Sequence, residues 1–200
     1  MTVVHWDDRP GDDLAVAVGA GWACLRRITI EPGDPLHLDA EDRETVVWTL
    51  DRDAVLVRRP GDLERSVRAQ ASLNVLIFAA GAAWADPLPA PPAQGVVQPS
   101  EVEGERVVDG LTSIVRRDVG GPAGAVGVGL ELVDVAPGRR SFPALDLEEL
   151  SVVLQGSGQV VAGGAEPWVV RGCVVGQGER FVAGPQGLRV LSFRELAQPA

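Results

Sequence analysis

The chain has 200 residues and a formal net charge of −10. This length suits one large domain or two of roughly 100 residues each. Because the charge is strongly negative, little counterion release is available for binding nucleic acid, and we expect no nucleic-acid partner. The chain has no lysine, which excludes Schiff-base chemistry and a P-loop. Its two histidines, His5 and His37, are not accompanied by the nucleophile motif of a Ser-His-Asp hydrolase.

The chain shows no targeting or membrane signal. The N-terminal segment 1–13 is acidic and lacks the apolar run of a secretory signal peptide. The longest apolar stretch, 73–85, is too short to span a bilayer. We therefore expect a cytoplasmic protein with no membrane partner. Cys24 and Cys173 lie far apart and belong to no Cys-x-x-Cys or Cys/His cluster, which predicts free, buried thiols.

Short runs of Val, Ile and Leu, broken by Gly, Pro and Asp, follow one another along the chain and predict an all-β fold. In chain order, the runs expected to contain strands are 25–34, 45–62, 73–78, 130–138, 151–164 and 188–195. The best helix candidate is 64–78, and its apolar end is better interpreted as a strand.

A proline-rich stretch divides the chain almost in half. Residues 86–101 are poor in large apolar side chains, which is typical of an extended, solvated connection. We therefore expect an N-terminal domain over 1–85, a linker over 86–101 and a C-terminal domain over 102–200.

The two halves resemble each other at a constant offset. Gly33 matches Gly138, and the same offset places Glu44 on Glu149. A hydrophobic run near the end of each half matches after a longer spacing in the second half. The pattern predicts an internal duplication of one β unit. Each copy then needs a closed or two-sheet geometry to bury both faces of its strands.

In the second half, Gly138 opens a motif in which Glu149 takes a glutamate place and Gly156 follows after six residues. This layout resembles the first motif of the cupins, the RmlC-like jelly-roll barrels. The resemblance covers nearly the whole chain and implies a bicupin, with two tandem cupin β-barrels.

The second half departs from the cupin pattern at the metal ligands. Ala144 and Asp146 stand where the family has histidines, and Phe181 occupies the place of the last histidine of the second motif. The resemblance therefore implies a barrel that is degenerate as a metal site, and no cofactor is favoured.

The first half offers a different set of donors. His37, Asp39 and Glu44 keep the family's ligand spacing with one histidine replaced by aspartate. If any divalent metal binds, one imidazole and two carboxylates would be its ligands. The alternative is that this acidic stretch is a solvated loop.

A cupin barrel is a concave container that can bind a small organic molecule without a metal ion. The residues expected to face inward in the second half are Phe142, Asp146, Glu149, Trp168, Arg180 and Phe181. An acid and a guanidinium facing one cavity, Glu149 and Arg180, would orient an anionic or zwitterionic ligand. The alternatives are that these two pair with each other, or that Glu149 points to solvent.

The stretch 142–158 is also similar to a segment of HutD proteins, which are bicupins linked to histidine utilisation. The Trp-Lys-Asn-Gly-Gly-Gly signature of that family has no counterpart in this lysine-free chain.

Three functions are consistent with these features. The first is non-catalytic or regulatory binding of a small anionic or zwitterionic metabolite. The second is an enzyme, either a metal-dependent oxygenase or isomerase using the first-half donors, or a metal-free lyase or isomerase with Asp146 or Glu149 as base. The third is a structural role in which the barrels pack as a homodimer. Sugar epimerases of the superfamily use a His and a Tyr, and this chain has no Tyr.

Overall fold

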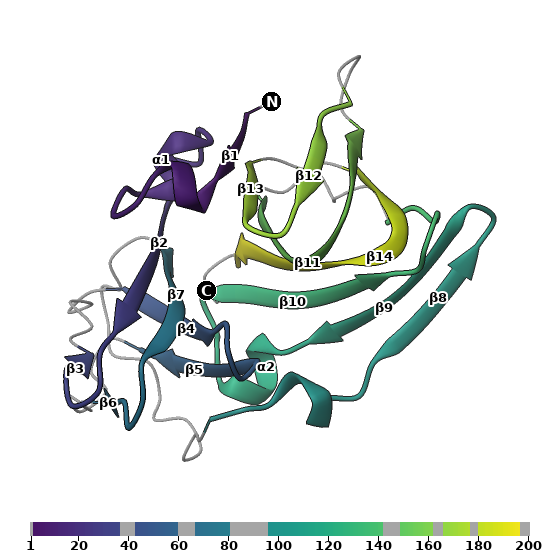
Figure 1. Cartoon of the computed structure of the whole chain (residues 1–200). Helices are drawn as coiled ribbons and strands as arrows, with labels where there is room; N and C mark the ends of the chain where they lie inside the picture. Colours follow the sequence, from purple (N-terminus) through teal and green to yellow (C-terminus); the bar gives the residue numbers. More distant parts are fainter. Residues whose placement is uncertain are drawn as a thin grey trace.

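The computed structural model describes residues 2–36, 43–59, 67–80, 96–141, 149–161, 166–176 and 180–196. Most of these residues lie in β-strands, which confirms the all-β prediction (Figure 1). The α-helices in this part of the chain are α1 (Leu14–Ala17) and α2 (Gly120–Ala123), and the 3-10 turns are η1 (Trp6–Asp8) and η2 (Pro99–Glu101). None of the helices described is long and apolar enough to cross a bilayer.

The first half contributes a four-stranded antiparallel sheet, called here the first sheet. Its order is β2 (Ala23–Ile30), β7 (Leu73–Ala80), β4 (Glu44–Thr49) and β5 (Ala54–Arg58). A separate pair consists of β3 (Pro35–Leu36) and β6 (Val67–Arg68). The strands coincide with the Val- and Ile-rich runs of the sequence, which pack well on a pleated surface.

The second half forms a curved eight-stranded sheet, called here the second sheet (Figure 1). Its order is β1 (Val3–His5), β13 (Cys173–Gly176), β11 (Glu149–Val161), β14 (Arg180–Glu195), β10 (Val128–Val135), β9 (Thr112–Asp118) and β8 (Glu105–Asp109), with β12 (Trp168–Val170) also paired to β11. The N-terminal strand β1 therefore pairs with a strand from the other end of the chain, with Val4 opposite Val174.

Gly156, which closes the predicted motif, lies where only glycine fits between two strands. Gly156 has φ of +82°, and a Cβ there would lie 2.2 Å from the carbonyl oxygen of Gly187. The register between β11 and β14 shifts on both sides of this residue. Such shifts bend a strand pair, and a side chain at this point would block the close approach of the two backbones.

The largest hydrophobic core lies between the two sheets. It takes Leu25, Trp48 and Phe78 from the first half, and Leu132 and Phe193 from the second. The rings of Phe78 and Phe193 stack with centroids 4.2 Å apart. Smaller clusters cover the opposite face of each sheet. The halves therefore share one core and fold against each other.

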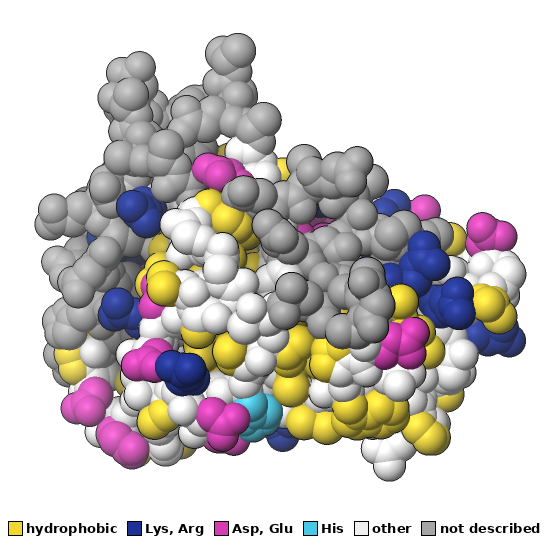
Figure 2. Space-filling view, turned by 90° about the horizontal axis from the view of Figure 1, so that it is seen from above, with side chains coloured by type: hydrophobic (Ala, Val, Ile, Leu, Met, Phe, Trp, Pro, Cys, Tyr) yellow, Lys and Arg dark blue, Asp and Glu magenta, His cyan; other side chains and the backbone are white. Residues whose placement is uncertain are grey.

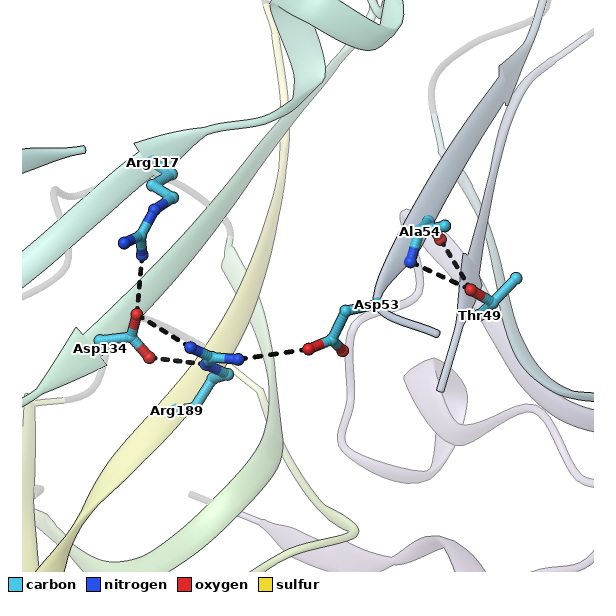
Figure 3. A network of polar contacts seen from close by, with 6 residues as sticks. All are labelled: Thr49, Asp53, Ala54, Arg117, Asp134 and Arg189. Atoms are coloured by element: carbon cyan, nitrogen blue, oxygen red, sulfur yellow. Dashed lines mark hydrogen bonds and ion pairs between the residues drawn. The ribbon is translucent and has the colours of Figure 1, made fainter. Parts of the chain in front are cut away.

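A network of charged side chains also joins the halves (Figure 3). Asp53 of the first half accepts a hydrogen bond from Arg189 at 3.2 Å. The same guanidinium donates to Asp134 at 2.6 Å, and Arg117 donates to Asp134 at 2.7 Å. These side chains are partly exposed, so solvent screening limits their contribution to stability. We infer that the network mainly fixes the orientation of the halves.

The end of the predicted linker is packed against the first sheet. Val97 exchanges two backbone hydrogen bonds with Val55, at 2.9 and 3.0 Å, and Pro99 is buried. The expectation of a solvated connection is therefore wrong for Val97 and Pro99. The stretch 81–95 lies outside the described residues.

The strand registers agree with the predicted repeat for one strand pair of each half. Ile28 of β2 pairs with Val75 of β7, and the matching residue of β10, Val133, pairs with Val190 of β14. Both halves therefore contain an antiparallel pair with this register.

Candidate functional site

A polar cluster occupies the face of the second sheet that points away from the shared core. Successive side chains of a strand point to opposite faces. On β11, Leu150 and Val152 belong to the shared core, so Glu149 and Ser151 face the other way. The cluster consists of Glu149, Ser151, Ser192, Arg194, Gly129 and Glu131.

Strand pairing sets these residues in two adjacent rows. Gly129, Arg194 and Glu149 lie opposite one another across β10, β14 and β11. Glu131, Ser192 and Ser151 form the next row on the same face. Side chains in neighbouring positions of adjacent strands lie close enough to interact. The register therefore gathers one guanidinium, two carboxylates and two hydroxyls on one small area.

A hollow lies over this cluster, lined by Gly129, Glu131, Glu149, Ser192 and Arg194. Its empty volume of about 190 Å³ includes open solvent at its mouth, and the enclosed part has room for about one water molecule. A Cβ at Gly129 would lie 2.6 Å from Nε and 2.7 Å from Cγ of Arg194. Glycine at this position therefore lets the arginine side chain lie across β10 and form part of the hollow.

The hydroxyls of the cluster are hydrogen bonded, whereas the guanidinium is not. Ser151 donates to Oε1 of Glu149 at 3.3 Å, and its Oγ is 3.1 Å from that of Ser192. Arg194 is half-buried and makes no hydrogen bond or ion pair with any other residue in the part of the chain that the structure describes. The N–H donors of Arg194 therefore have no acceptor among the described residues.

Glu131 is the most perturbed carboxylate of the hollow. Burial raises its pKa, and the charges of Arg116 and Arg194 oppose that shift. The nearby carboxylates of Glu149 and Asp118 raise the pKa further by like-charge repulsion. Glu131 therefore holds a proton more readily than an exposed glutamate does.

The structure separates the two residues that were expected to act together. Glu149 lies in the hollow opposite Arg194, whereas Arg180 pairs with Val161 at the far end of the same ladder. Arg180 therefore does not line the hollow, and the two side chains do not pair with each other. The guanidinium beside Glu149 is that of Arg194, which the sequence interpretation missed.

The other predicted ligand-binding residues do not line the hollow. Phe181 is buried in the core of the second sheet, and its N–H donates to Ser141 Oγ at 2.8 Å. Trp168 lies on β12 with 55% of its surface exposed. Hydrophobic side chains gather along one edge of the face shown in Figure 2, with charged side chains around them. Phe142 and Asp146 lie outside the described residues.

Glu44 lies on the opposite face of its sheet from the one that was expected. Thr45 pairs with Ala79 of β7, and Glu149 pairs with Arg194, which is the residue of β14 matching Ala79. Thr45 is thus the counterpart of Glu149, and the predicted match of Glu44 with Glu149 is wrong by one residue. A slip of one residue moves a side chain to the other face of a sheet.

The carboxylate of Glu44 is fully buried between the halves. It accepts hydrogen bonds from the backbone N–H groups of Val126 at 3.0 Å, Gly127 at 3.2 Å and Val128 at 2.9 Å. Burial raises its pKa, although these N–H groups and Arg59 favour the charged form. His37 and Asp39, the other proposed ligands of a first-half metal, lie outside the described residues.

Both cysteines are free, as predicted. Cys173 is buried, and Cys24 is half-buried. Burial, together with Asp13, raises the pKa of the Cys24 thiol to about 11. A thiol with such a pKa is protonated at neutral pH and is a poor nucleophile.

Comparison with known proteins identifies the fold. No protein-family model matches the chain, and no curated protein matches its sequence. Among solved structures, mutants of Bacillus subtilis oxalate decarboxylase align over 100% of this chain and 78% of theirs, one with TM-score 0.69 and 12% identity. A protein of Pseudomonas aeruginosa named as glyoxylate-induced aligns over 90% of this chain and 77% of its own, with TM-score 0.68 and 15% identity.

These neighbours are cupin-fold proteins, and at such identities the likeness establishes the fold alone. Mn(II) centres are known in the Bacillus oxalate decarboxylase. In this chain, the described residues contain no group of three or more His, Cys, Asp or Glu side chains placed to hold a metal ion. The hollow holds two carboxylates, Glu131 and Glu149, but the guanidinium of Arg194 lies among them, and its positive charge does not fit a Mn(II) centre.

Proposed function

We propose that this chain is a bicupin that binds a small anionic or zwitterionic metabolite in the hollow of its second half, without a metal and without catalysis. In this proposal the units are 1–85 and 102–200, joined by 86–101. The observation that supports it best is Arg194, a half-buried guanidinium that has no partner among the described residues and lies opposite Glu149.

The chemistry of the hollow favours a zwitterion over a dianion. A guanidinium binds a carboxylate through two parallel hydrogen bonds. Glu131 and Glu149 would repel a second negative group and attract an ammonium group. The enclosed part of the hollow has room for about one water molecule, so only a small molecule that reaches in from the open mouth can contact Arg194. An α-amino acid carries both charges at the required short separation.

A thermal-shift screen of α-amino acids, organic acids and sugars tests this proposal. A ligand present at 100 times its Kd stabilises the folded state by about 2.7 kcal/mol. Histidine belongs in the screen because of the sequence similarity to HutD proteins. Arg194→Met is expected to abolish the shift, and Arg180→Met, which changes an arginine far along the same strand, is the matched control. A shift that survives Arg194→Met would place the ligand elsewhere, and the absence of any shift would favour a structural role.

Metal analysis tests the second part of the proposal. Protein purified without chelators or metal-affinity columns is expected to contain far less than one equivalent of Mn, Fe, Ni or Zn. Near-stoichiometric metal that disappears in His37→Ala would instead support a first-half metal site.

Proton transfer is the second candidate function, and Glu131 is the observation that favours it. A carboxyl group whose pKa is raised by burial holds its proton more readily and can act as a general acid or base. A metal-free isomerase or lyase would exchange the α-proton of a bound amino acid with solvent. Proton NMR in D2O would show this exchange in the wild type and its loss in Glu131→Gln. We expect no exchange beyond the uncatalysed rate.

Self-association is a further proposal. The exposed hydrophobic side chains of β12, Trp168 and Val170, support a contact between two copies. Light scattering coupled to size exclusion measures the mass directly. A dimer that becomes monomeric in Trp168→Ser would support this contact.

A further inference from the structure

The buried carboxylate of Glu44 connects the first half to the wall of the hollow. Glu44 is the first residue of β4, and its three hydrogen-bond donors are consecutive backbone N–H groups of the second half. These are hydrogen bonds to a charged acceptor with 0% exposure. Such bonds are stronger than those between neutral groups, and the buried N–H groups would be left unsatisfied without them.

The clamped segment leads directly into the hollow. Val128 begins β10, and the next residue, Gly129, is the one across which Arg194 lies. The carbonyl of Gly127 accepts the N–H of Leu196 at 2.9 Å, just beyond Arg194 on the neighbouring strand. The Glu44 carboxylate therefore fixes the segment that leads to Gly129, across which the guanidinium lies. The same segment bonds Leu196, which directly follows the strand that carries Arg194.

We propose that Glu44 is a positioning residue for the hollow of the second half: by fixing 126–128 it sets the place of Gly129 and Arg194, so that ligand affinity depends on a residue that never touches the ligand. This inference rests on the proposed ligand-binding function. It also gives the first half a role in binding, although its own counterpart positions lack the polar cluster.

Hydrogen–deuterium exchange separates the positioning claim from the binding claim, because it needs no ligand. In Glu44→Ala the amides of 126–128 lose an ionic acceptor worth about 1.5–3 kcal/mol each, so we expect about 10- to 150-fold faster exchange there. If Glu44 positions the hollow, amide exchange in Glu44→Ala is also faster at Gly129–Glu131 and at Leu196. Glu44→Gln, which keeps the volume and one acceptor oxygen, is the second variant should Glu44→Ala fail to fold.

The matched control is Asp53→Asn. Asp53 is also a first-half acid that bonds a second-half residue, Arg189, but it does not contact the segment leading to the hollow. We expect exchange at Gly129–Glu131 to be unchanged in this variant. If Glu44→Ala or Glu44→Gln speeds exchange only at 126–128, or if Asp53→Asn has the same effect as they do, Glu44 is a structural residue and the inference is wrong.

Binding provides the second measurement, with glycine as the minimal zwitterionic probe and calorimetry as the method. At temperatures where each variant is fully folded, we expect the Kd of glycine to rise at least about tenfold in Glu44→Ala and to stay within twofold in Asp53→Asn. Faster exchange at Gly129–Glu131 with no glycine binding in the wild type would support the positioning role and contradict the proposed zwitterion site. Faster exchange with an unchanged Kd would contradict the link to affinity.

Discussion

The two halves of this protein place different chemistry on the same strand framework. The second-half positions Glu131, Glu149, Ser192 and Arg194 correspond by strand register to Arg26, Thr45, Ile77 and Ala79 of the first half. Both sets lie on the face directed away from the shared core. In both halves, hydrophobic side chains alternate along the strands so that one face packs in the shared core. The side chains on the face directed away from that core differ between the halves in charge and polarity. Fold and site therefore depend on different residues of the same strands.

A substitution in the shared core is expected to reduce the free energy of unfolding more than any other change proposed here. Phe78 is fully buried and stacks on Phe193, so Phe78→Ala is expected to reduce the free energy of unfolding by about 3–5 kcal/mol. Chemical denaturation measures the loss, and Val108→Ala, at a position with 63% exposure, is the control. A loss below about 1 kcal/mol would mean that the halves do not depend on this contact. A single unfolding transition is expected, because both halves contribute to one core.

A substitution at the bend of the second sheet is expected to cause the next largest loss of stability. Gly156→Ala forces a Cβ against the Gly187 carbonyl at a residue with positive φ. We expect a loss of about 2–4 kcal/mol, since strain at such a position adds to a backbone clash. Gly138→Ala is the matched control, because Gly138 also has positive φ but nothing within 4 Å of its Cβ position. Equal losses in both variants would show that the close approach of β11 and β14 contributes nothing.

The preference for glycine over acetate tests whether the acid of the second half, and not its first-half counterpart, contributes to ligand binding. Neutralising the acid in Glu131→Gln is expected to weaken binding of glycine and to strengthen binding of acetate, which lacks the ammonium group. Each change is expected to be about 10-fold or less, as for single partly exposed charges. Arg26→Gln, at the counterpart position in the first half, is expected to change neither affinity. Parallel losses for glycine and acetate in Glu131→Gln would indicate that this carboxylate only supports the structure.

The smallest expected effect is a pH dependence at Glu44. Because burial raises its pKa in the folded state, the folded protein holds this proton more tightly than the unfolded chain does. The resulting stabilisation is fully present below the ordinary glutamate pKa, about 4.3, and is lost as the pH rises through the raised value. The stability of the wild type relative to Glu44→Gln should therefore fall as the pH rises across that window. A relative stability that increases with pH would mean that the N–H groups outweigh burial.

Much of the fold could be predicted from the sequence, because alternation and turn residues act locally. The β2 and β10 strands, the repeat between them and Gly156 all follow from runs of Val, Ile and Leu bounded by Gly and Pro. The one-residue slip at Glu44 could not be predicted, since spacing does not show which face a strand presents. The packing of Val97 and the pairing of β1 with β13 depend on contacts distant in sequence.

The site was predicted only in part. Glu149 was found because it takes the glutamate place of a motif. Arg194 was missed because it belongs to no motif, and only the register of β14 against β11 brings it to Glu149. The alternation of 188–195 was nevertheless a signal, because it places Ser192 and Arg194 on one face, opposite Leu191 and Phe193.

The proposal that Arg194 binds the carboxylate of a zwitterionic ligand is tested most directly by a crystal structure. The crystal should contain the α-amino acid that gives the largest thermal shift. We expect the ligand carboxylate to accept two hydrogen bonds from Arg194 and the ammonium group to lie between Glu131 and Glu149. A ligand bound in the first half, or in the second half without contact to Arg194, would contradict the proposal.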